Sequence, residues 1–407
     1  MQMIDNRWLF DYPIVDFPIA DDMDPLLAWR QEFPIVDTCT YLVSHSLGAM
    51  PRRTSAYLQQ FADEWSRRGV RAWHEGWWEI GKDTGNLLAP ILGAARDTIT
   101  MHQNATVAQS IVASAFSFDG RRNKVVLQDL DFPTNHYLFA GLRRYGAEVV
   151  IVPSDDTIRA PIDRLVDAID ERTALVPISL VLFRSACLQD VRPVVEKAHR
   201  VGASVVLDVY QGAGAVPIDL AGSGVDFAVG GSVKYLCGGP GAGYLYVRPD
   251  LVRDLAPSVV GWAGHAEPFA FETGPIRYAE GIERVQSGTP NVPALYSARA
   301  GYEIVASIGL PAIREKSLRL TRRLMDAARQ RGWRLNTPTD DRERGGSVVV
   351  DVPDGARVTD ALLARGVIVD YRPKAGIRMA PHFYNTEAEI DRAVETIDAC
   401  LSARPRT

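Results

Sequence analysis

The stretch Ser204–Pro240, SVVLDVYQGAGAVPIDLAGSGVDFAVGGSVKYLCGGP, decides the fold of this chain. One nearly continuous apolar run ends at Asp208, a second run ends at Gly230, and Lys234 follows in a glycine-rich loop. Strands that are covered on both faces of a sheet have such continuous apolar runs. The stretch therefore predicts two buried strands, each followed by a loop that carries a charged side chain.

The same pattern repeats through the middle of the chain. We predict strands at residues 124–128, 148–152, 174–179, 204–209, 226–230 and 243–247, and expect the first four to be covered on both faces. Helical patterns such as 191–201 lie between several of them, which indicates βαβ units and a mainly parallel sheet. The loop before 243–247 is too short for a crossover helix, so the last two strands should be antiparallel neighbours in a mixed sheet.

The pattern changes after Pro293. A long helical stretch from Ala294 to about Arg331 contains only the helix-breaking residues 309–311. Short strands at 347–352 and 367–369 and a final helix from Glu387 to about Leu401 follow it. We therefore predict an α/β protein with a large domain over residues 51–290 and a small α/β domain made of residues 1–50 and 291–407. The strand at 40–43 should join the small domain.

Composition excludes several classes of function. The chain has 407 residues, 46% of them hydrophobic and 23% charged, and its formal net charge is −5. That balance offers no basic field for nucleic acid or for an anionic membrane surface. The N-terminal residues 1–22 lack the basic start and apolar core of a signal peptide, and no stretch approaches membrane-spanning length. We expect a cytoplasmic protein.

The four cysteines show no metal-binding pattern. Cys39, Cys187, Cys237 and Cys400 form no CxxC pair and have no spacing typical of a zinc site. Neither a metal nor a disulfide framework is expected.

Asp208 and Lys234 together predict a cofactor. A pyridoxal 5′-phosphate (PLP) enzyme needs a carboxylate against the pyridinium nitrogen and a lysine that forms a Schiff base with the cofactor aldehyde. Asp208 ends a strand, where ligands of open α/β sheets bind, and the glycines around Lys234 allow a close approach to the ring. Either residue alone is explained as well by a turn cap or a surface lysine. Their combination across one strand–loop–strand unit favours PLP.

The chain resembles kynureninase and its relatives, the class-V aminotransferase-like branch that includes the cysteine desulfurases. The resemblance rests on the stretch quoted above and on motifs in the same order: TYLVSHSLGAMP (40–51), LDFPTNHY (130–137), FRSA (183–186), GWAGH (261–265), SGTP (287–290) and GIRMAPHFYN (376–385). It implies the PLP-dependent transferase fold of type I, an amino-acid substrate, and a homodimer whose active sites are shared between subunits.

The resemblance also implies roles for individual residues. Asp208 would pair with the pyridinium nitrogen, while Lys234 would hold the cofactor and move the proton at Cα. Gln211 would contact the phenolic oxygen, Phe132 would stack on the ring, and Arg378 would bind the substrate α-carboxylate. Phosphate contacts would come from Ala105 and Thr106 at a helix N-terminus, from Ser232 and Trp262, and from Thr289 of the other subunit.

Departures from the family pattern bear on the reaction. Gln211 stands where kynureninases have His, Asn135 replaces an Asp, Val233 replaces a Tyr, and His45 replaces an Asn. Each exchange keeps cofactor binding intact and removes a group used on kynurenine. Desulfurization through a persulfide is not expected either, since the segment around Arg378 has no cysteine.

The residues that face the substrate follow no motif. The run RAWHEGWWEIG (71–81) is either a helix face packed on the core or an aromatic substrate wall, with His74 as a proton donor. Tyr210 is either a packed ring or a proton donor. The candidate substrate residues are His45, His74, Trp77, Asn135 and Tyr210.

The expected activity is cleavage of a Cβ bond through a Cα carbanion, in the form of C–S β-elimination from a bulky S-substituted cysteine-like substrate. The alternatives are kynureninase-type hydrolysis, transamination, epimerisation and oxygen-dependent decarboxylation or deamination. A PLP-fold protein without catalytic function is disfavoured, because Asp208, Lys234 and Arg378 are all present.

Overall fold

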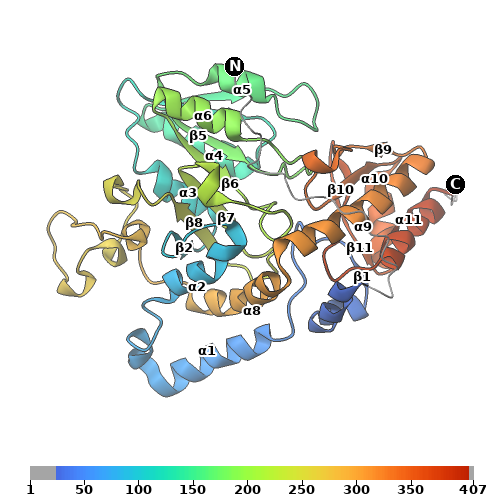
Figure 1. Ribbon diagram of the computed structural model, residues 1–407, viewed down its shortest axis with the longest axis horizontal. Helices are drawn as coiled ribbons and strands as arrows, with labels where there is room; N and C mark the ends of the chain where they lie inside the picture. The colour runs from blue at the N-terminus through green and yellow to red at the C-terminus, as the bar shows by residue number, and fades with distance from the viewer. Residues whose placement is uncertain (1–23, 403–407) are drawn as a thin grey trace, which may run out of the picture.

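The computed structural model describes residues 24–402, which form a large and a small α/β body at opposite ends of the molecule (Figure 1). The N-terminal residues from which a signal peptide was excluded lie outside the described range. None of the helices within residues 24–402 is both long enough and apolar enough to cross a membrane.

A seven-stranded sheet forms the centre of the large body. In spatial order its strands are β2 (Ile99–His102), β8 (Gly243–Val247), β7 (Phe227–Gly231), β6 (Ser204–Asp208), β5 (Thr173–Ser179), β3 (Lys124–Gln128) and β4 (Glu148–Val152). β7, β6, β5, β3 and β4 are mutually parallel, and β8 pairs antiparallel with β7 and with β2. The predicted mixed, mainly parallel sheet is confirmed, as is the antiparallel neighbour pair after residue 226.

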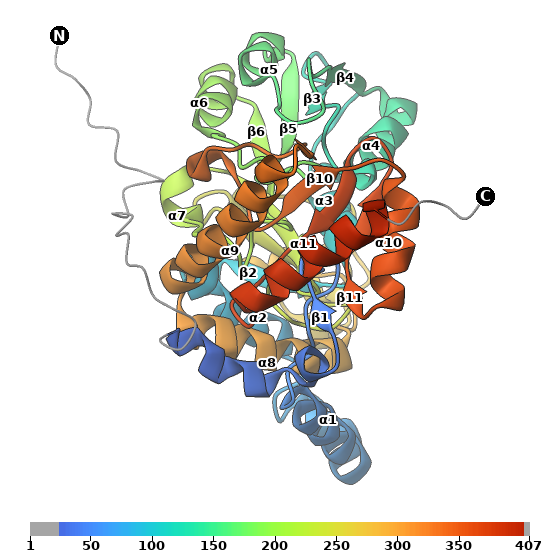
Figure 2. The ribbon, with the colours of Figure 1, turned by 90° about the vertical axis from the view of Figure 1, so that its right-hand side faces the viewer.

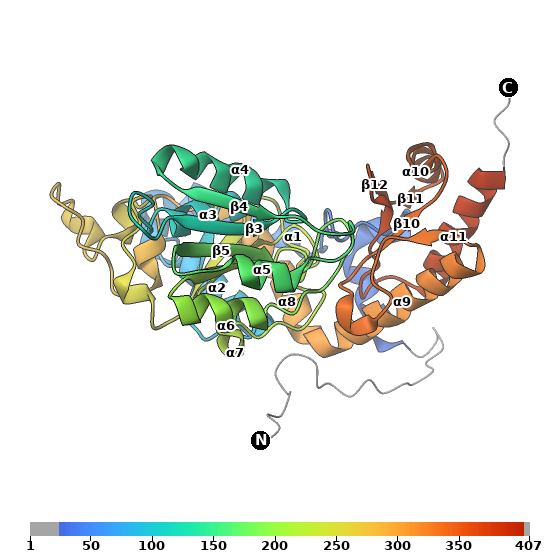
Figure 3. The ribbon, with the colours of Figure 1, turned by 90° about the horizontal axis from the view of Figure 1, so that it is seen from above.

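Side chains of the central strands alternate between two apolar cores. On β6, Val205 and Leu207 face one core and Val206 faces the other. The first core packs against helices α2 (Ile80–Leu88), α5 (Ile162–Ala168), α6 (Arg192–Val201) and α8 (Val292–Ile308). The second packs against α3 (Ala105–Ala113) and α4 (Pro133–Gly141), so α4 and the α5–α6 pair lie on opposite sides of the sheet (Figure 3). Burial on both faces explains the continuous apolar runs of the sequence.

Two strands of the large sheet differ from prediction. β4 lies at the sheet edge and its Ile151 is exposed, so the expectation that β4 is covered on both faces is wrong. β2 was not predicted because Ile99–His102 is short and ends in a histidine. It is held by antiparallel pairing with β8, a contact between residues far apart in the chain.

The small body has its own sheet and core. Its antiparallel strands follow the order β12 (Asp370–Arg372), β13 (Gly376–Met379), β10 (Val348–Asp351) and β9 (Arg334–Leu335). The helices are α9 (Leu310–Gln330), α10 (Gly355–Ala364) and α11 (Glu387–Ser402), and α9 and α11 lie side by side across the small sheet (Figure 2). The long helical stretch breaks into α8 and α9 at Gly309, where φ is +85° and glycine is favoured.

The N-terminal segment packs with the small body. β1 (Thr40–Tyr41) pairs in parallel with β11 (Val367–Ile368), and Leu42 belongs to the small apolar core. The next segment runs into α1 (Thr54–Arg68), which projects from the bottom of the view in Figure 1. The domain limits at residues 51 and 290 stay a prediction.

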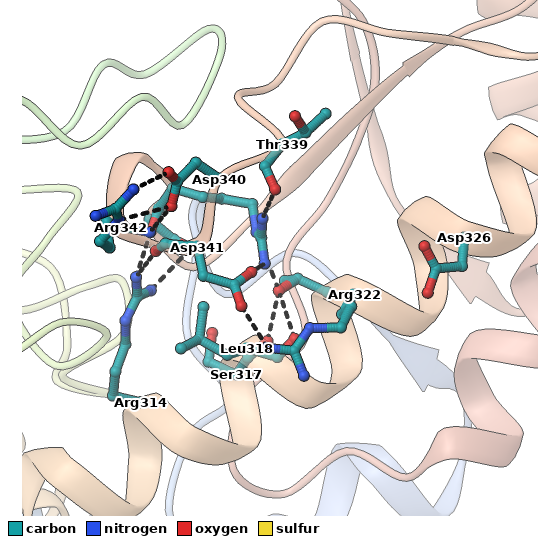
Figure 4. A network of polar contacts seen from close by, with 12 residues as sticks. Arg314, Ser317, Leu318, Arg322, Asp326, Thr339, Asp340, Asp341 and Arg342 are labelled. Carbon is teal, nitrogen blue, oxygen red and sulfur yellow. Dashed lines mark hydrogen bonds and ion pairs between the residues drawn. The ribbon is translucent and has the colours of Figure 1, made fainter. Parts of the chain in front are cut away.

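A loop of the small body also joins it to the large one. The amides of Leu188 and Gly345 donate to Glu343 O and Ala186 O, at 2.8 Å and 2.7 Å. Behind this contact the Asp341 carboxylate binds the guanidinium groups of Arg322 and the buried Arg344 (Figure 4). A buried guanidinium is stable only with such partners, so this network holds the loop on α9.

Candidate active site

A cavity of about 380 Å³ opens at the carboxyl edge of the large sheet and reaches the small body. The predicted site residues that line it are His45, Ala105, Thr106, Phe132, Asp208, Tyr210, Gln211, Lys234 and Arg378. They come together because the parallel strands β6 and β7 end at the same edge, where α3 also begins.

Asp208 is the last residue of β6 and is 8% exposed. Its Oδ1 accepts a hydrogen bond from the Tyr210 amide at 2.9 Å, and Oδ2 has no partner among the described residues. Burial raises the pKa of the Asp208 carboxyl to about 6, although the Tyr210 amide and Lys234 act in the opposite direction. A buried carboxylate with one free oxygen suits a protonated ring nitrogen, because the added positive charge would restore the ionised form.

Lys234 lies in the loop after β7, with its amine between two aromatic rings. Nζ is 4.3 Å from the centre of the Tyr210 ring and 5.8 Å from that of Phe132. The Tyr210 ring fits there because Gly231 has no side chain, as a Cβ at that position would lie 2.4 Å from Tyr210 Oη. Burial lowers the pKa of Lys234 to about 8, with Asp208 opposing the shift. A lysine of lowered pKa is a better nucleophile toward an aldehyde at neutral pH.

The N-terminus of α3 fits a phosphate group. Asn104 caps the helix, with Oδ1 accepting from the Val107 amide at 3.0 Å. Ala105 and Thr106 line the cavity, and as the first residues of the helix their amides have no partner within it. A helix start with free amides is a favourable site for an anion.

Arg378 on β13 reaches the cavity from the small body, and its guanidinium already donates hydrogen bonds to other residues of the chain. Nε and Nη2 donate to the two oxygens of Asp370 at 2.8 Å and 2.5 Å, and Nη1 donates to Phe183 O at 2.6 Å. Asp370 also binds Arg372 Nη2, at 3.0 Å from Oδ2, and His45 Nε2, at 3.2 Å from Oδ1.

Asp370 and Arg372 were missed by the sequence analysis. Both belong to the segment VDYRPKAGIR, and Asp370 pairs directly with Arg378 across the β12–β13 hairpin. An acid and an arginine two residues apart, just before the short turn that leads to the predicted clamp arginine, were a signal for them.

Three predicted residues do not line the cavity. Ser232 is fully buried, and its hydroxyl donates to Ala242 O while lying 2.6 Å from Tyr302 Oη. Ser232 does not line the cavity, and its phosphate contact stays a prediction. Asn135 lies outside the cavity lining, where its Oδ1 accepts from Gln109 at 2.9 Å. Trp77, 7% exposed, stacks on Phe61 and donates to Glu64 at 3.0 Å. Ser232 and Trp77 have their polar partners elsewhere, whereas the buried Asn135 Nδ2 has no hydrogen-bond partner among the described residues.

The aromatic run at 71–81 forms no continuous helix face. A 3₁₀ helix ends at Trp73 and α2 begins at Ile80, with turns between them. His74 is exposed beside Phe269 and does not line the cavity. Trp77 supports the packing alternative, and neither residue forms a substrate wall within one chain.

Trp262 and Thr289 lie on the surface of the large body, outside the cavity lining. Trp262 packs against Trp78, Phe269 and Phe271 in an exposed aromatic cluster. A role for either residue at the cofactor would require a second subunit.

The donor set therefore fits PLP. Lys234 would bind the aldehyde, Asp208 the ring nitrogen, and the start of α3 the phosphate, while Phe132 and Tyr210 would border the ring. Among residues 24–402, no cluster of three or more histidine, cysteine, aspartate or glutamate side chains could hold a metal ion.

Known proteins agree with the resemblance seen in the motifs. The family described as Aminotransferase class-V matches residues 40–392. Kynureninase from Pseudomonas fluorescens is 32% identical over 403 residues, covering 94% of both chains, and kynureninase from Deinococcus radiodurans is 34% identical over 396 residues, also covering 94% of both.

Solved structures share the fold at lower identity. The apo cysteine desulfurase from Thermococcus onnurineus NA1 superposes with a TM-score of 0.81 at 18% identity, covering 92% of this chain and 97% of that one. The cystine C–S lyase C-DES in complex with cysteine persulfide gives 0.80 at 20% identity, covering 90% and 98%. The predicted fold and family are confirmed. The chain belongs to the aminotransferase class-V family, a family of pyridoxal 5′-phosphate enzymes.

Proposed function

We propose that this enzyme acts on an amino acid through a Cα carbanion and cleaves a bond at Cβ, expelling a thiolate from an S-substituted cysteine-like substrate. The observation that carries the proposal is that Lys234, Asp208 and Arg378, from three distant segments, line one cavity. When bound, PLP supplies an electron sink for negative charge at Cα.

The residues of the chain would divide the work as follows. Arg378 holds the substrate α-carboxylate, which orients the Cα–H bond toward Lys234. The Lys234 amine removes the Cα proton, a task that its lowered pKa favours near neutral pH. Tyr210, whose ring contacts the Lys234 amine, is the tyrosine that lines the cavity, and its phenol would protonate a departing sulfur.

Elimination is preferred over kynurenine hydrolysis because the cavity lacks groups for the second reaction. Hydrolysis needs an activated water at the γ-carbonyl and further proton transfers. Val233 lines the cavity with an apolar side chain, and Gln211 Nε2 donates to His45 O at 3.3 Å. His45 is buried, and burial lowers its pKa to about 4, so it is neutral at neutral pH and offers no imidazolium as a general acid.

Kynureninase-type hydrolysis is the second candidate. It is favoured by the 32–34% identity to kynureninases over nearly the whole chain. The two candidates share Lys234, Asp208 and Arg378 and differ in the bond that breaks and in the activated water and proton transfers that hydrolysis needs.

A substrate panel separates these candidates. The purified holoenzyme is incubated with S-alkyl and S-aryl cysteines, kynurenine and unsubstituted amino acids, with and without O₂, and products are measured by mass spectrometry. We expect a thiol, pyruvate and ammonia in equal amounts, with water consumed and no oxygen uptake, at a kcat/KM at least about tenfold above that for kynurenine. Anthranilate at a comparable rate, or carbon dioxide release that requires O₂, would refute the elimination.

We also propose a homodimer whose active sites are completed across the interface. An apolar cavity of about 900 Å³ lies at the N-terminal end of α1. Its lining residues Leu47, Met50 and Leu58 are exposed in the single chain. Contiguous exposed apolar surface of this kind marks protein interfaces. Thr289 and the Trp262 cluster lie on the same body and would reach a partner's phosphate site.

Mixing two inactive variants tests the shared sites. A Lys234→Ala protomer and a Thr289→Asp protomer are each expected to be inactive, the second because a carboxylate repels the phosphate. In a random mixture half of the dimers are mixed and each has one intact site, so about a quarter of wild-type activity should return. A monomer that is fully active at assay concentration would contradict the proposal. As a control, Lys234→Ala is mixed with a Ser110→Ala protomer, whose own activity should be unaffected.

A further inference from the structure

One carboxylate, Asp370, organises the small-body side of the cavity. It binds Arg378 through two hydrogen bonds, Arg372 through Oδ2 and His45 through Oδ1. All three partners line the cavity, whereas Asp370 does not. Asp370 therefore acts on a bound substrate through its neighbours.

The Arg378 guanidinium is only partly used by these contacts. It has five N–H groups, and three of them donate to Asp370 and Phe183 O. The two that are left, one on Nη1 and one on Nη2, are available to bind a carboxylate. Asp370 thus fixes Arg378 along one edge and leaves the other edge for substrate.

Pairing with the Asp370 carboxylate neutralises the charge of Arg378. An arginine paired side-on with an aspartate attracts a second carboxylate weakly, because the pair has no net charge. Arg372 corrects the balance: it contacts the same aspartate, lines the cavity and is 43% exposed at its mouth. Since His45 is neutral, the three charged groups carry a net charge of +1, which matches one substrate carboxylate.

We propose that Arg372 is a specificity-determining residue that shares the substrate α-carboxylate with Arg378, and that Asp370 is the positioning residue for both arginines. The inference rests on the proposed action on an amino acid and names the part of the substrate that is recognised. It assigns the site to amino acids with a free α-carboxylate and excludes their amides.

The test compares an acid with its amide on the same holoenzyme. L-phenylalanine and L-phenylalaninamide, whose side chain has no leaving group, are titrated against the cofactor absorbance band, and the ratio of their dissociation constants measures recognition of the carboxylate. Because the amine pKa difference between the two ligands is the same for every variant, it cancels when ratios are compared.

Arg372→Gln should lower the preference for the acid about tenfold, and Arg372→Lys should retain most of it. Arg378→Gln, the reference for loss of the clamp, should abolish the preference. Arg164→Gln, the same change in an exposed arginine of α5 that pairs with Asp155, should leave it unchanged. A wild-type preference in Arg372→Gln would overturn the role of Arg372.

Asp370→Asn separates positioning from charge. The variant raises the net charge of the clamp from +1 to +2, so a purely electrostatic clamp would bind the acid more tightly. We expect the preference to fall, because Arg378 loses its charged bidentate partner. The double variant Asp370→Asn, Arg372→Gln returns the net charge to +1 and should stay impaired, whereas recovery would overturn the positioning role.

Two further measurements complete the design. Melting temperature and cofactor content per chain show whether each variant is folded and loaded. If neither ligand changes the cofactor band of the wild-type enzyme, the proposed action on amino acids is wrong and the inference falls with it. If the acid binds with a preference that no variant at 370 or 372 alters, only the inference is wrong.

Discussion

Replacing Lys234 with alanine is expected to lower turnover by at least about 10³-fold and to remove the covalent link between chain and cofactor. Lys234 is the only lysine lining the cavity among residues 24–402, and its lowered pKa suits it to remove the Cα proton. Steady-state kinetics and borohydride reduction followed by peptide mass mapping measure the two effects.

Lys197→Ala on the outer helix α6 is the matched control and should keep wild-type turnover. Labelling of a lysine other than Lys234 in the reduced wild-type enzyme would contradict the assignment.

The lowered pKa of Lys234 predicts how the rate of cofactor loading depends on pH. Only the neutral amine attacks an aldehyde, so loading of the apoenzyme with PLP should accelerate up to a pH of about 8 and then level off. An unperturbed lysine would continue to accelerate above that pH.

Asp208→Asn is expected to lower kcat by at least about 100-fold, or ~2.7 kcal/mol in activation free energy, while cofactor affinity falls much less. The amide keeps the shape of the carboxyl group but carries no charge to hold a proton on the ring nitrogen, so the electron sink is weakened. The phosphate contacts at the start of α3 are untouched. The measurements are kcat under saturating substrate and the dissociation constant of PLP from absorbance titration.

A second aspartate provides the control for this variant. Asp129 also follows a parallel strand, β3, at the same edge of the sheet, and its carboxylate accepts from Ser154 outside the cavity. Asp129→Asn should leave kcat within about twofold of wild type. An unchanged kcat in Asp208→Asn would show that another group protonates the ring.

The local sequence pattern was sufficient to predict most strands of the large sheet. Five of the central strands are buried on both faces, so their sequences are continuously apolar and end at turn residues, which single segments reveal without knowledge of their neighbours. The break at Gly309 is equally local, because a positive φ depends on the residue itself. β4 has the same apolar pattern and yet lies at the edge, since strand order depends on which segments meet in space.

The candidate site residues also divide into those that local sequence predicts and those that depend on distant contacts. Asp208 and Lys234 could be predicted because each follows a recognisable strand, and two parallel neighbours must end at the same edge. Ser232, two residues before Lys234, could not be placed, because its direction depends on Tyr302 of α8, which lies 70 residues away. Trp77 was equally ambiguous until its packing on Phe61 was known.

Apolar periodicity, glycine-rich turns and motif order are properties of contiguous segments, so the fold family, the buried strands and the pairing of Asp208 with Lys234 at one sheet edge could be predicted from the sequence alone. Only the tertiary structure decided how the substrate side of the cavity is built. Arg378 is oriented by Asp370 across a hairpin and by Phe183 from the other body, and Arg372 joins it through the same carboxylate. Those contacts depend on the docking of two separately formed cores, and the direction of a polar side chain at such a boundary is set by partners that are distant in the chain.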